Sequence, residues 1–85
     1  MGADSLAPNT HTDYHQVTVE RDGETLWEYV GLSNRIFTSN LVNGGYTVFA
    51  YYNGAMVARC SYNKDDIVGV VSLTEEEYKM YINSK

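Results

Sequence analysis

Two dipeptides that end in glycine constrain the fold of this chain more than any other feature of its sequence. They are Asp22-Gly23 and Asn53-Gly54, and each stands between two segments rich in β-forming residues. Such pairs favour two-residue hairpin turns, because both central positions take a positive φ that Asp, Asn and Gly tolerate. The sequence therefore predicts two antiparallel hairpins, over residues 14–30 and 46–62.

In the first hairpin, residues 14–21 are expected to pair with residues 24–30. Regular pairing from the turn places Arg21 opposite Glu24, Val19 opposite Leu26, Val17 opposite Glu28 and His15 opposite Val30. Cross-strand partners share a face, so Glu28 falls in an otherwise apolar row, and Trp27 and Tyr29 lie on the other face. A charge in such a row is costly unless it lies at a sheet edge or meets a partner.

This pattern leaves two interpretations open. Either Glu28 is displayed to a binding partner, or it is solvated at a sheet edge or belongs to a different register. Trp27 and Tyr29 are correspondingly either core residues, with Glu28 facing outward, or an exposed aromatic patch of the kind that anchors interfaces.

The second hairpin is apolar on both faces, which is typical of a central position in a sheet. Its expected pairs are Tyr52–Ala55, Tyr51–Met56, Ala50–Val57, Phe49–Ala58 and Val48–Arg59, with Cys60 opposite Thr47. A C-terminal helix covers only one face, so residues 31–43 cover the other, or it remains an apolar groove. The candidates to line that groove are Ile36, Phe37, Leu41, Val42, Val48, Met56 and Val57; in the alternative, these residues form the core.

The remaining segments complete the expected architecture. Residues 31–43 fit either a helix capped by Ser33 or a strand through Arg35–Thr38, and residues 67–71 fit a short strand. Thr74 and Glu77 form a capping-box pattern, which predicts a helix over residues 75–83. The expected fold class is therefore α+β: a single antiparallel β-sheet of about five strands with one or two short helices packed on it. Residues 14–85 form one domain, after a flexible N-terminal tail over residues 1–13.

The composition of the chain argues against several classes of function. The 85 residues, 44% of them hydrophobic, suit one small domain with a limited core. Acidic residues exceed basic ones by 11 to 6, which argues against a nucleic-acid partner. No apolar run is long enough for a transmembrane helix, and residues 1–13 lack the features of a signal peptide. The single cysteine, Cys60, suits a reducing cytoplasm.

The sequence does not indicate catalytic or metal chemistry. His11 and His15 stand four residues apart, but in an extended segment that spacing does not converge on a metal. Cys60 lies mid-strand, which favours a small apolar packing role over a nucleophile. The acids at 75–77 suit the N-terminus of the predicted helix. We expect a binding protein without catalytic residue, metal or cofactor, and not an enzyme.

Several segments together carry a family resemblance. Trp27-Glu28 is followed by the stretch Gly-Leu-Ser-Asn-Arg-Ile at residues 31–36. The hairpin from Tyr46 through Tyr51-Tyr52 leads into an aliphatic strand, and Asp66 precedes Ile-Val. In these motifs, in their order and in the polar turn after the second hairpin, roughly residues 14–72 resemble the staphylococcal-type uracil-DNA glycosylase inhibitors. The first hairpin and its Gly-Leu-Ser continuation are also similar to the smaller inhibitor of phi29-like phages.

The resemblance implies a phage protein that mimics DNA and inhibits a host enzyme. In these inhibitors, a carboxylate-bearing edge strand replaces DNA phosphates in the groove of the glycosylase, and a hydrophobic pocket sequesters the enzyme's minor-groove loop. Carried over, Glu28 is the central phosphate mimic, with Tyr29 and Trp27 on the same strand. The implied pocket residues are Ile36, Phe37, Leu41, Val48, Met56 and Val57.

The expected partner is therefore a uracil-DNA glycosylase, bound as a 1:1 complex in the host bacterial cytoplasm by a protein that is monomeric when free. Two alternatives stay open. One is a phage anti-CRISPR or anti-restriction protein that blocks another DNA-binding enzyme. The other is a small structural protein whose unusual patterning marks an oligomer interface, for which an exposed edge strand would serve.

Overall fold

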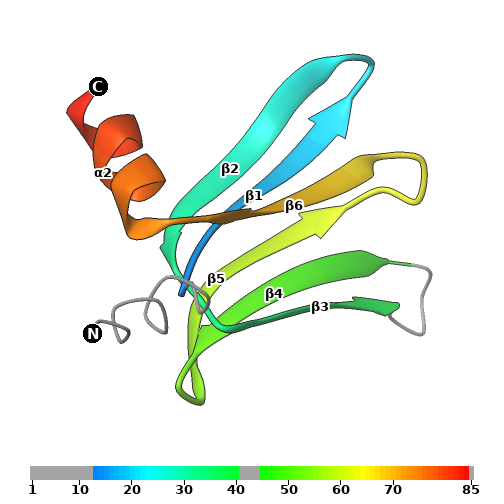
Figure 1. Cartoon of the computed structure of the whole chain (residues 1–85). Helices are drawn as coiled ribbons and strands as arrows, with labels where there is room; N and C mark the ends of the chain where they lie inside the picture. Colours follow the sequence, from blue (N-terminus) through cyan, green and yellow to red (C-terminus); the bar gives the residue numbers. More distant parts are fainter. Residues whose placement is uncertain (1–12, 41–44, 85) are drawn as a thin grey trace, which may run out of the picture.

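The computed structural model describes residues 13–40 and 45–84 of the chain. Its strands are β1 (Tyr14–Arg21), β2 (Glu24–Leu32), β3 (Arg35–Asn40), β4 (Tyr46–Tyr52), β5 (Ala55–Tyr62) and β6 (Ile67–Leu73), followed by helix α2 (Glu75–Asn83) (Figure 1). They form two antiparallel sheets, a first sheet of order β2-β1-β6 and a second sheet of order β3-β4-β5. The α+β class is confirmed, but the expected single sheet is wrong, because six strands divide between two sheets.

Both hairpin turns have the backbone that the sequence predicts. Asp22 and Gly23 have φ values of 54° and 82°, and Asn53 and Gly54 have φ values of 51° and 87°. Positive φ at both central positions is the signature of the type I′ turn.

Each hairpin then departs from regular pairing by one residue. Glu20 pairs with Thr25 but Val19 pairs with Trp27, which leaves Leu26 as the extra residue of a β-bulge. In the second hairpin, Tyr51 pairs with Met56 but Ala50 pairs with Ala58, which leaves Val57 as the extra residue. A bulge moves every later side chain to the opposite face, because side chains alternate along a strand.

The expected pairs next to the turns are therefore confirmed, and those beyond the bulges are wrong. Arg21–Glu24, Tyr52–Ala55 and Tyr51–Met56 form as expected. The pairs that do not form are Val19–Leu26, Val17–Glu28, His15–Val30, Ala50–Val57, Phe49–Ala58, Val48–Arg59 and Thr47–Cys60; Cys60 instead lies opposite Val48.

The bulge at Leu26 decides which face of β2 meets the core. Trp27 packs against the buried core cluster, and Tyr29 lies opposite the fully buried Val17. Glu28 lies opposite Thr18 on the outer face of the first sheet. This arrangement buries the larger aromatic surface and leaves the carboxylate outside, as desolvation costs require. The apolar row around Glu28 therefore does not exist.

The two sheets share one small core. Its fully buried members are Val17 and Val19 of β1 and Val48 of β4. Partly buried side chains from the other four strands pack against them; they are Trp27, Ile36, Cys60, Tyr62 and Val68. Every described strand thus contributes to the core, and its small size follows from the short chain.

The chain crosses between the sheets at Ser33 and Asn34. The Ser33 amide donates to the Asp13 carbonyl oxygen at 2.7 Å, and the Asn34 amide donates to the Tyr51 carbonyl oxygen at 2.8 Å. These two bonds tie consecutive residues to different sheets. Of the two interpretations for residues 31–43, the strand is confirmed over β3; Leu41 and Val42 lie outside the described residues, as do His11 and residues 1–12 of the predicted tail.

The predicted C-terminal helix is confirmed, with its capping box. The Glu77 amide donates to Thr74 Oγ1 at 3.0 Å, and the Thr74 amide donates to Glu77 Oε1 at 2.8 Å. The helix lies against the first sheet, where the Tyr78 ring stacks on Tyr14 with centroids 4.2 Å apart (Figure 1). It therefore leaves the outer face of the second sheet uncovered by helix.

Candidate functional site

Glu28 is an exposed carboxylate on an edge strand, and it is held in place from two other elements. Gln16 Nε2 of β1 donates to its Oε2 at 2.7 Å, and Tyr81 Oη of α2 donates to its Oε1 at 2.6 Å. Hydrogen bonds to an ionised acceptor are short and strong. The arrangement presents a fixed negative charge at the edge of the first sheet.

The acidic residues are segregated within the fold. None of the strands of the second sheet, β3, β4 and β5, carries an Asp or Glu, whereas β3 carries Arg35 and β5 carries Arg59. The described carboxylates lie on the first sheet, in the turns and on α2; they are Asp13, Glu20, Asp22, Glu24, Glu28, Asp65, Asp66, Glu75, Glu76 and Glu77. The charge of the chain is therefore distributed unevenly, because the first sheet is acidic and the second sheet is cationic.

One of these carboxylates has a structural role instead. Arg21 donates two hydrogen bonds of 2.8 Å to the Asp66 carboxylate, which also accepts from the Asn63 amide at 2.9 Å. The Asp66 side chain is only 2% exposed. Hydrogen bonding by Arg21, then by the Asn63 amide, lowers the pKa of Asp66 from 3.8 to about 2. This pair ties the turn between β5 and β6 to the end of β1.

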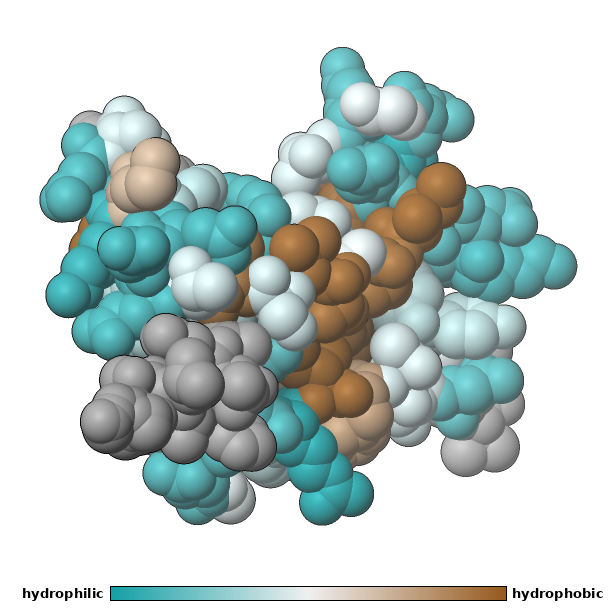
Figure 2. All heavy atoms as spheres, in the orientation of Figure 1, coloured by the Kyte–Doolittle hydropathy of each residue, from teal (hydrophilic) through white to brown (hydrophobic). Residues whose placement is uncertain are grey.

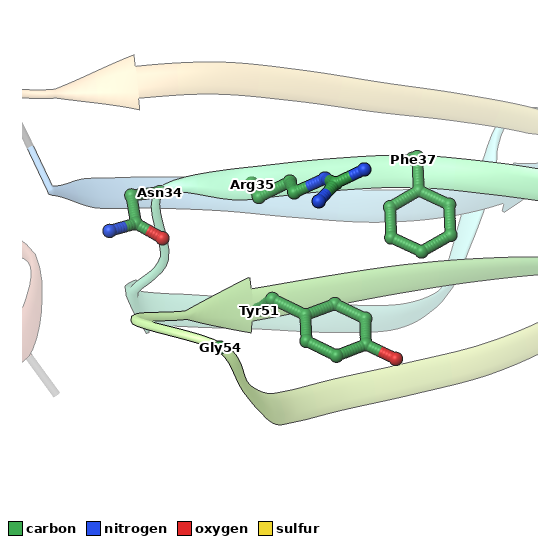
Figure 3. Close-up of a pocket in the computed structure, with 5 residues that line it drawn as sticks. All are labelled: Asn34, Arg35, Phe37, Tyr51 and Gly54. Carbon is green, nitrogen blue, oxygen red and sulfur yellow. The ribbon is translucent and has the colours of Figure 1, made fainter.

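A second candidate surface lies on the outer face of the second sheet. The Phe37 ring stacks with Phe49 at 5.2 Å and with Tyr51 at 5.5 Å between centroids, and the Arg35 guanidinium lies 5.4 Å from the Phe37 centroid. A shallow pocket of about 340 Å³ is lined by Asn34, Arg35, Phe37, Tyr51 and Gly54 (Figure 3). Figure 3 shows the Phe37 and Tyr51 rings side by side on neighbouring strands.

The residues predicted for a hydrophobic pocket are divided between two faces. Ile36 and Val48 pack in the core, whereas Phe37 lies in the pocket of Figure 3. Met56 lies opposite Tyr51 beside the turn, and Val57 is the bulge residue. Leu41 lies outside the described residues. Of the members of the predicted set that the structure describes, Phe37 alone lines the pocket of Figure 3.

Sequence reasoning missed the other pocket residues, although a signal was present. In a strand that starts at Arg35, alternation places Arg35 and Phe37 on one face. Regular pairing with β4 then adds Tyr51 opposite Arg35 and Phe49 opposite Phe37. Because the sequence of residues 31–43 fitted either a helix or a strand, this alternation could not be assigned in advance.

The described cysteine and histidine do not form a reactive pair. Burial, then the nearby charge of Asp66, raises the pKa of the Cys60 thiol, which disfavours the nucleophilic thiolate. His15 Nδ1 lies 2.8 Å from the Ser33 carbonyl oxygen and 2.9 Å from Ser33 Oγ. Ser33 is fully buried, so this contact is inaccessible to a substrate and instead fixes the crossing between the sheets. Within residues 13–40 and 45–84, no group of three His, Cys, Asp or Glu side chains has metal-binding geometry.

An apolar band of exposed side chains lies on β5 and β6, each of which is an edge strand of its sheet. Figure 2 shows apolar side chains gathered over these strands. The exposed large apolar residues that they carry are Met56, Val57, Ile67, Val70 and Val71. The strands β5 and β6 are both sheet edges and do not pair with each other. Unpaired apolar edges are places where strands of other chains can add.

Among the described residues, no helix is long and apolar enough to cross a membrane. Comparison of the chain with family models, with curated proteins and with solved structures finds no match.

Proposed function

We propose that this protein inhibits a uracil-DNA glycosylase by occupying its DNA-binding groove. The observation that carries the proposal is Glu28, an exposed carboxylate on an edge strand, held by Gln16 and Tyr81. It lies in the segment where the sequence resembles glycosylase inhibitors. A fixed carboxylate on a strand edge suits a positively charged groove that normally holds DNA phosphates.

The charge distribution supports the same proposal. A DNA-binding groove is basic, and an acidic partner surface accelerates association with it. The first sheet and α2 supply such a surface, while Arg35 and Arg59 belong to the second sheet. The proposal therefore places the first sheet, led by Glu28 on β2, in the groove of the enzyme. It does not rely on the hydrophobic pocket that the resemblance implies.

The test is a uracil-excision assay in which the protein is titrated against a bacterial uracil-DNA glycosylase. Excision is expected to fall in proportion to added protein and to stop near equimolar ratio. Glu28→Gln keeps the side-chain shape and removes the charge. Loss of one partner from a close interfacial charge pair costs about 2 kcal/mol or more, so binding should weaken roughly 30-fold.

Glu76→Gln is the matched control, because it changes the net charge equally and Glu76 is an exposed residue of α2. It should change the affinity by less than about threefold, as for a charge at the rim of an interface. Equal effects of the two variants would remove Glu28 from the proposed role. Unchanged excision with excess protein, for two unrelated glycosylases of this class, would refute the function.

A second candidate function is supported by the apolar band over β5 and β6. Exposed valine and isoleucine side chains beside two unpaired edges suit a contact with another copy of the chain. Light scattering at increasing concentration tests it. A monomeric mass throughout would exclude the assembly, whereas a dimer that Val70→Lys dissociates would support it.

A further inference from the structure

The outer face of the second sheet combines aromatic rings with cations, and the proposed inhibition does not use it. Phe37, Phe49 and Tyr51 form one cluster, with all three pairs of ring centroids between 5.2 and 6.5 Å apart. Arg35 lies opposite Tyr51, and Arg59 lies opposite Phe49. Because cross-strand partners share a face, both arginines border the rings.

This aromatic–arginine face is accessible. Phe37 is 40% exposed, and Arg35 and Arg59 are exposed. None of the three rings belongs to the core cluster between the sheets. The pocket beside Phe37 and Tyr51 adds about 340 Å³ of open space (Figure 3). The face therefore presents the exposed part of the Phe37 ring, with the half-buried Phe49 and Tyr51 rings beside it.

The local charge of the face is opposite to that of the chain. Its three strands carry no carboxylate, and the ion pairs found among the described residues, Arg21–Asp66 and Lys79–Glu75, involve neither of its arginines. An anion that approaches these three strands therefore meets two cations and no carboxylate side chain on them.

We propose that the aromatic–arginine face binds a short segment of single-stranded nucleic acid. Bases stack on Phe37 and Tyr51, and Arg35 and Arg59 contact the phosphates. Stacking on aromatic side chains beside a cationic track is how single strands are bound without sequence preference. Asn34 lines the pocket, and its side chain is held there by Asn53: Asn34 Nδ2 donates to Asn53 Oδ1 at 2.9 Å, and Asn34 Oδ1 accepts from the Asn53 amide at 3.2 Å.

One feature favours this ligand over an apolar protein segment, and another favours a single strand over a duplex. An apolar segment would form no favourable electrostatic interaction with the two arginines beside the rings. A nucleotide strand can stack its bases on the rings and place its phosphates next to the arginines. A duplex keeps its bases stacked inside, so only a single strand exposes base faces to the rings. The exclusion of nucleic acid on whole-chain charge therefore does not apply to this face, because the fold separates the two signs.

The test is fluorescence anisotropy of a labelled ten-residue oligothymidylate, titrated with the full-length protein at several salt concentrations. Saturable binding is expected. Two phosphate contacts give a slope of about −1.4 for log K against log salt, and Arg35→Gln should reduce that slope by about 0.7. Phe37→Leu removes the ring but keeps an apolar side chain, and it should weaken binding about fivefold or more.

Leu32→Ala is the matched control, since Leu32 is as exposed as Phe37, at 38%, but lies on the first sheet. It should bind the oligonucleotide like the wild type. Thermal melting of each variant confirms that it is folded. No binding, equal binding by wild type and Phe37→Leu, or equal binding of an abasic oligomer would overturn the proposal. A concentration-dependent dimer that Phe37→Leu abolishes would instead assign the face to self-association.

The two proposals fail independently. Glu28→Gln should leave oligonucleotide binding unchanged, and Arg59→Gln, a change on the aromatic–arginine face, should leave inhibition of the glycosylase unchanged. If Arg59→Gln abolishes the inhibition, the protein acts by sequestering the DNA substrate, and the DNA-mimic proposal is refuted. If only oligonucleotide binding is absent, inhibition through Glu28 is unaffected.

Discussion

Because of the bulge in the first hairpin, we expect substitutions of the adjacent residues Leu26 and Trp27 to change the stability of the fold by very different amounts. Regular pairing would bury Leu26 and expose Trp27, whereas the structure leaves Leu26 49% exposed and packs Trp27 against the core. Trp27→Ala and Leu26→Ala should therefore have very unequal effects on stability. The difference in stability between the two variants tests the register of β2, and that register determines that Glu28 faces outward.

The magnitudes follow from buried area. A largely buried tryptophan removes on the order of 150 Å² from water, so at about 25 cal/mol per Å² its loss costs about 3–4 kcal/mol. Leu26 is half exposed, so its truncation costs about 1 kcal/mol. In a domain of this size, 1 kcal/mol corresponds to about 4–8 °C in melting temperature. The two variants should therefore differ by about 10 °C or more.

The assay is thermal unfolding followed by circular dichroism. Trp27 is the only tryptophan of the chain, so its fluorescence reports its burial without any substitution. Emission of the wild type should be blue-shifted from that of free tryptophan and protected from acrylamide quenching, even if Trp27→Ala does not fold. A greater loss of stability for Leu26→Ala, together with solvent-like emission, would refute the bulge and restore regular pairing.

Two predictions concern the structural contacts around the site. Because the folded-state pKa of Asp66 lies near 2, below its ordinary 3.8, its stabilising effect is complete above about pH 4 and is lost as the pH falls toward 2. Asp66→Asn should therefore melt lower than the wild type at pH 7 and converge with it near pH 2; a constant difference across that range would contradict the role of the pair with Arg21. Thr74→Ala removes the capping box and should destabilise α2 by about 1 kcal/mol, seen as faster amide hydrogen exchange in Tyr78–Asn83 with unchanged exchange in β1. Unchanged exchange in that helix segment would show that packing alone holds α2.

The local signals in the sequence predicted much of the fold. Asp22-Gly23 and Asn53-Gly54 specify turns by backbone conformation alone, and Thr74 with Glu77 specifies a helix start by two hydrogen bonds. Such devices act over a few residues, so they can be recognised without tertiary structure.

The register and the number of sheets depend on long-range packing instead. A bulge at Leu26 has no strong local signature, because it forms where burial of Trp27 outweighs regular pairing. The crossing at Ser33 needs hydrogen-bond partners from Asp13 and Tyr51, residues far apart in the sequence. The expected sheet of five strands therefore could not be separated from two sheets of three by periodicity.

The candidate site, too, combines features that the local sequence could show with features that depend on long-range packing. Glu28 stood out because of an assumed register, and its exposure at the edge of the first sheet has a different structural reason. Its contacts with Gln16 and Tyr81 join three elements, and no local pattern could show them. The aromatic–arginine face was missed because Arg35 and Phe37 share a face only if residues 35–40 are a strand.

The most direct test of the account is complex formation with a uracil-DNA glycosylase in the absence of DNA. Isothermal titration calorimetry should show one protein per enzyme, with affinity that falls as salt is raised and that Glu28→Gln weakens roughly 30-fold. Uracil-containing duplex DNA should displace the protein from the enzyme. The absence of a complex at micromolar concentrations, or a complex that binds DNA without displacement, would contradict the central claim.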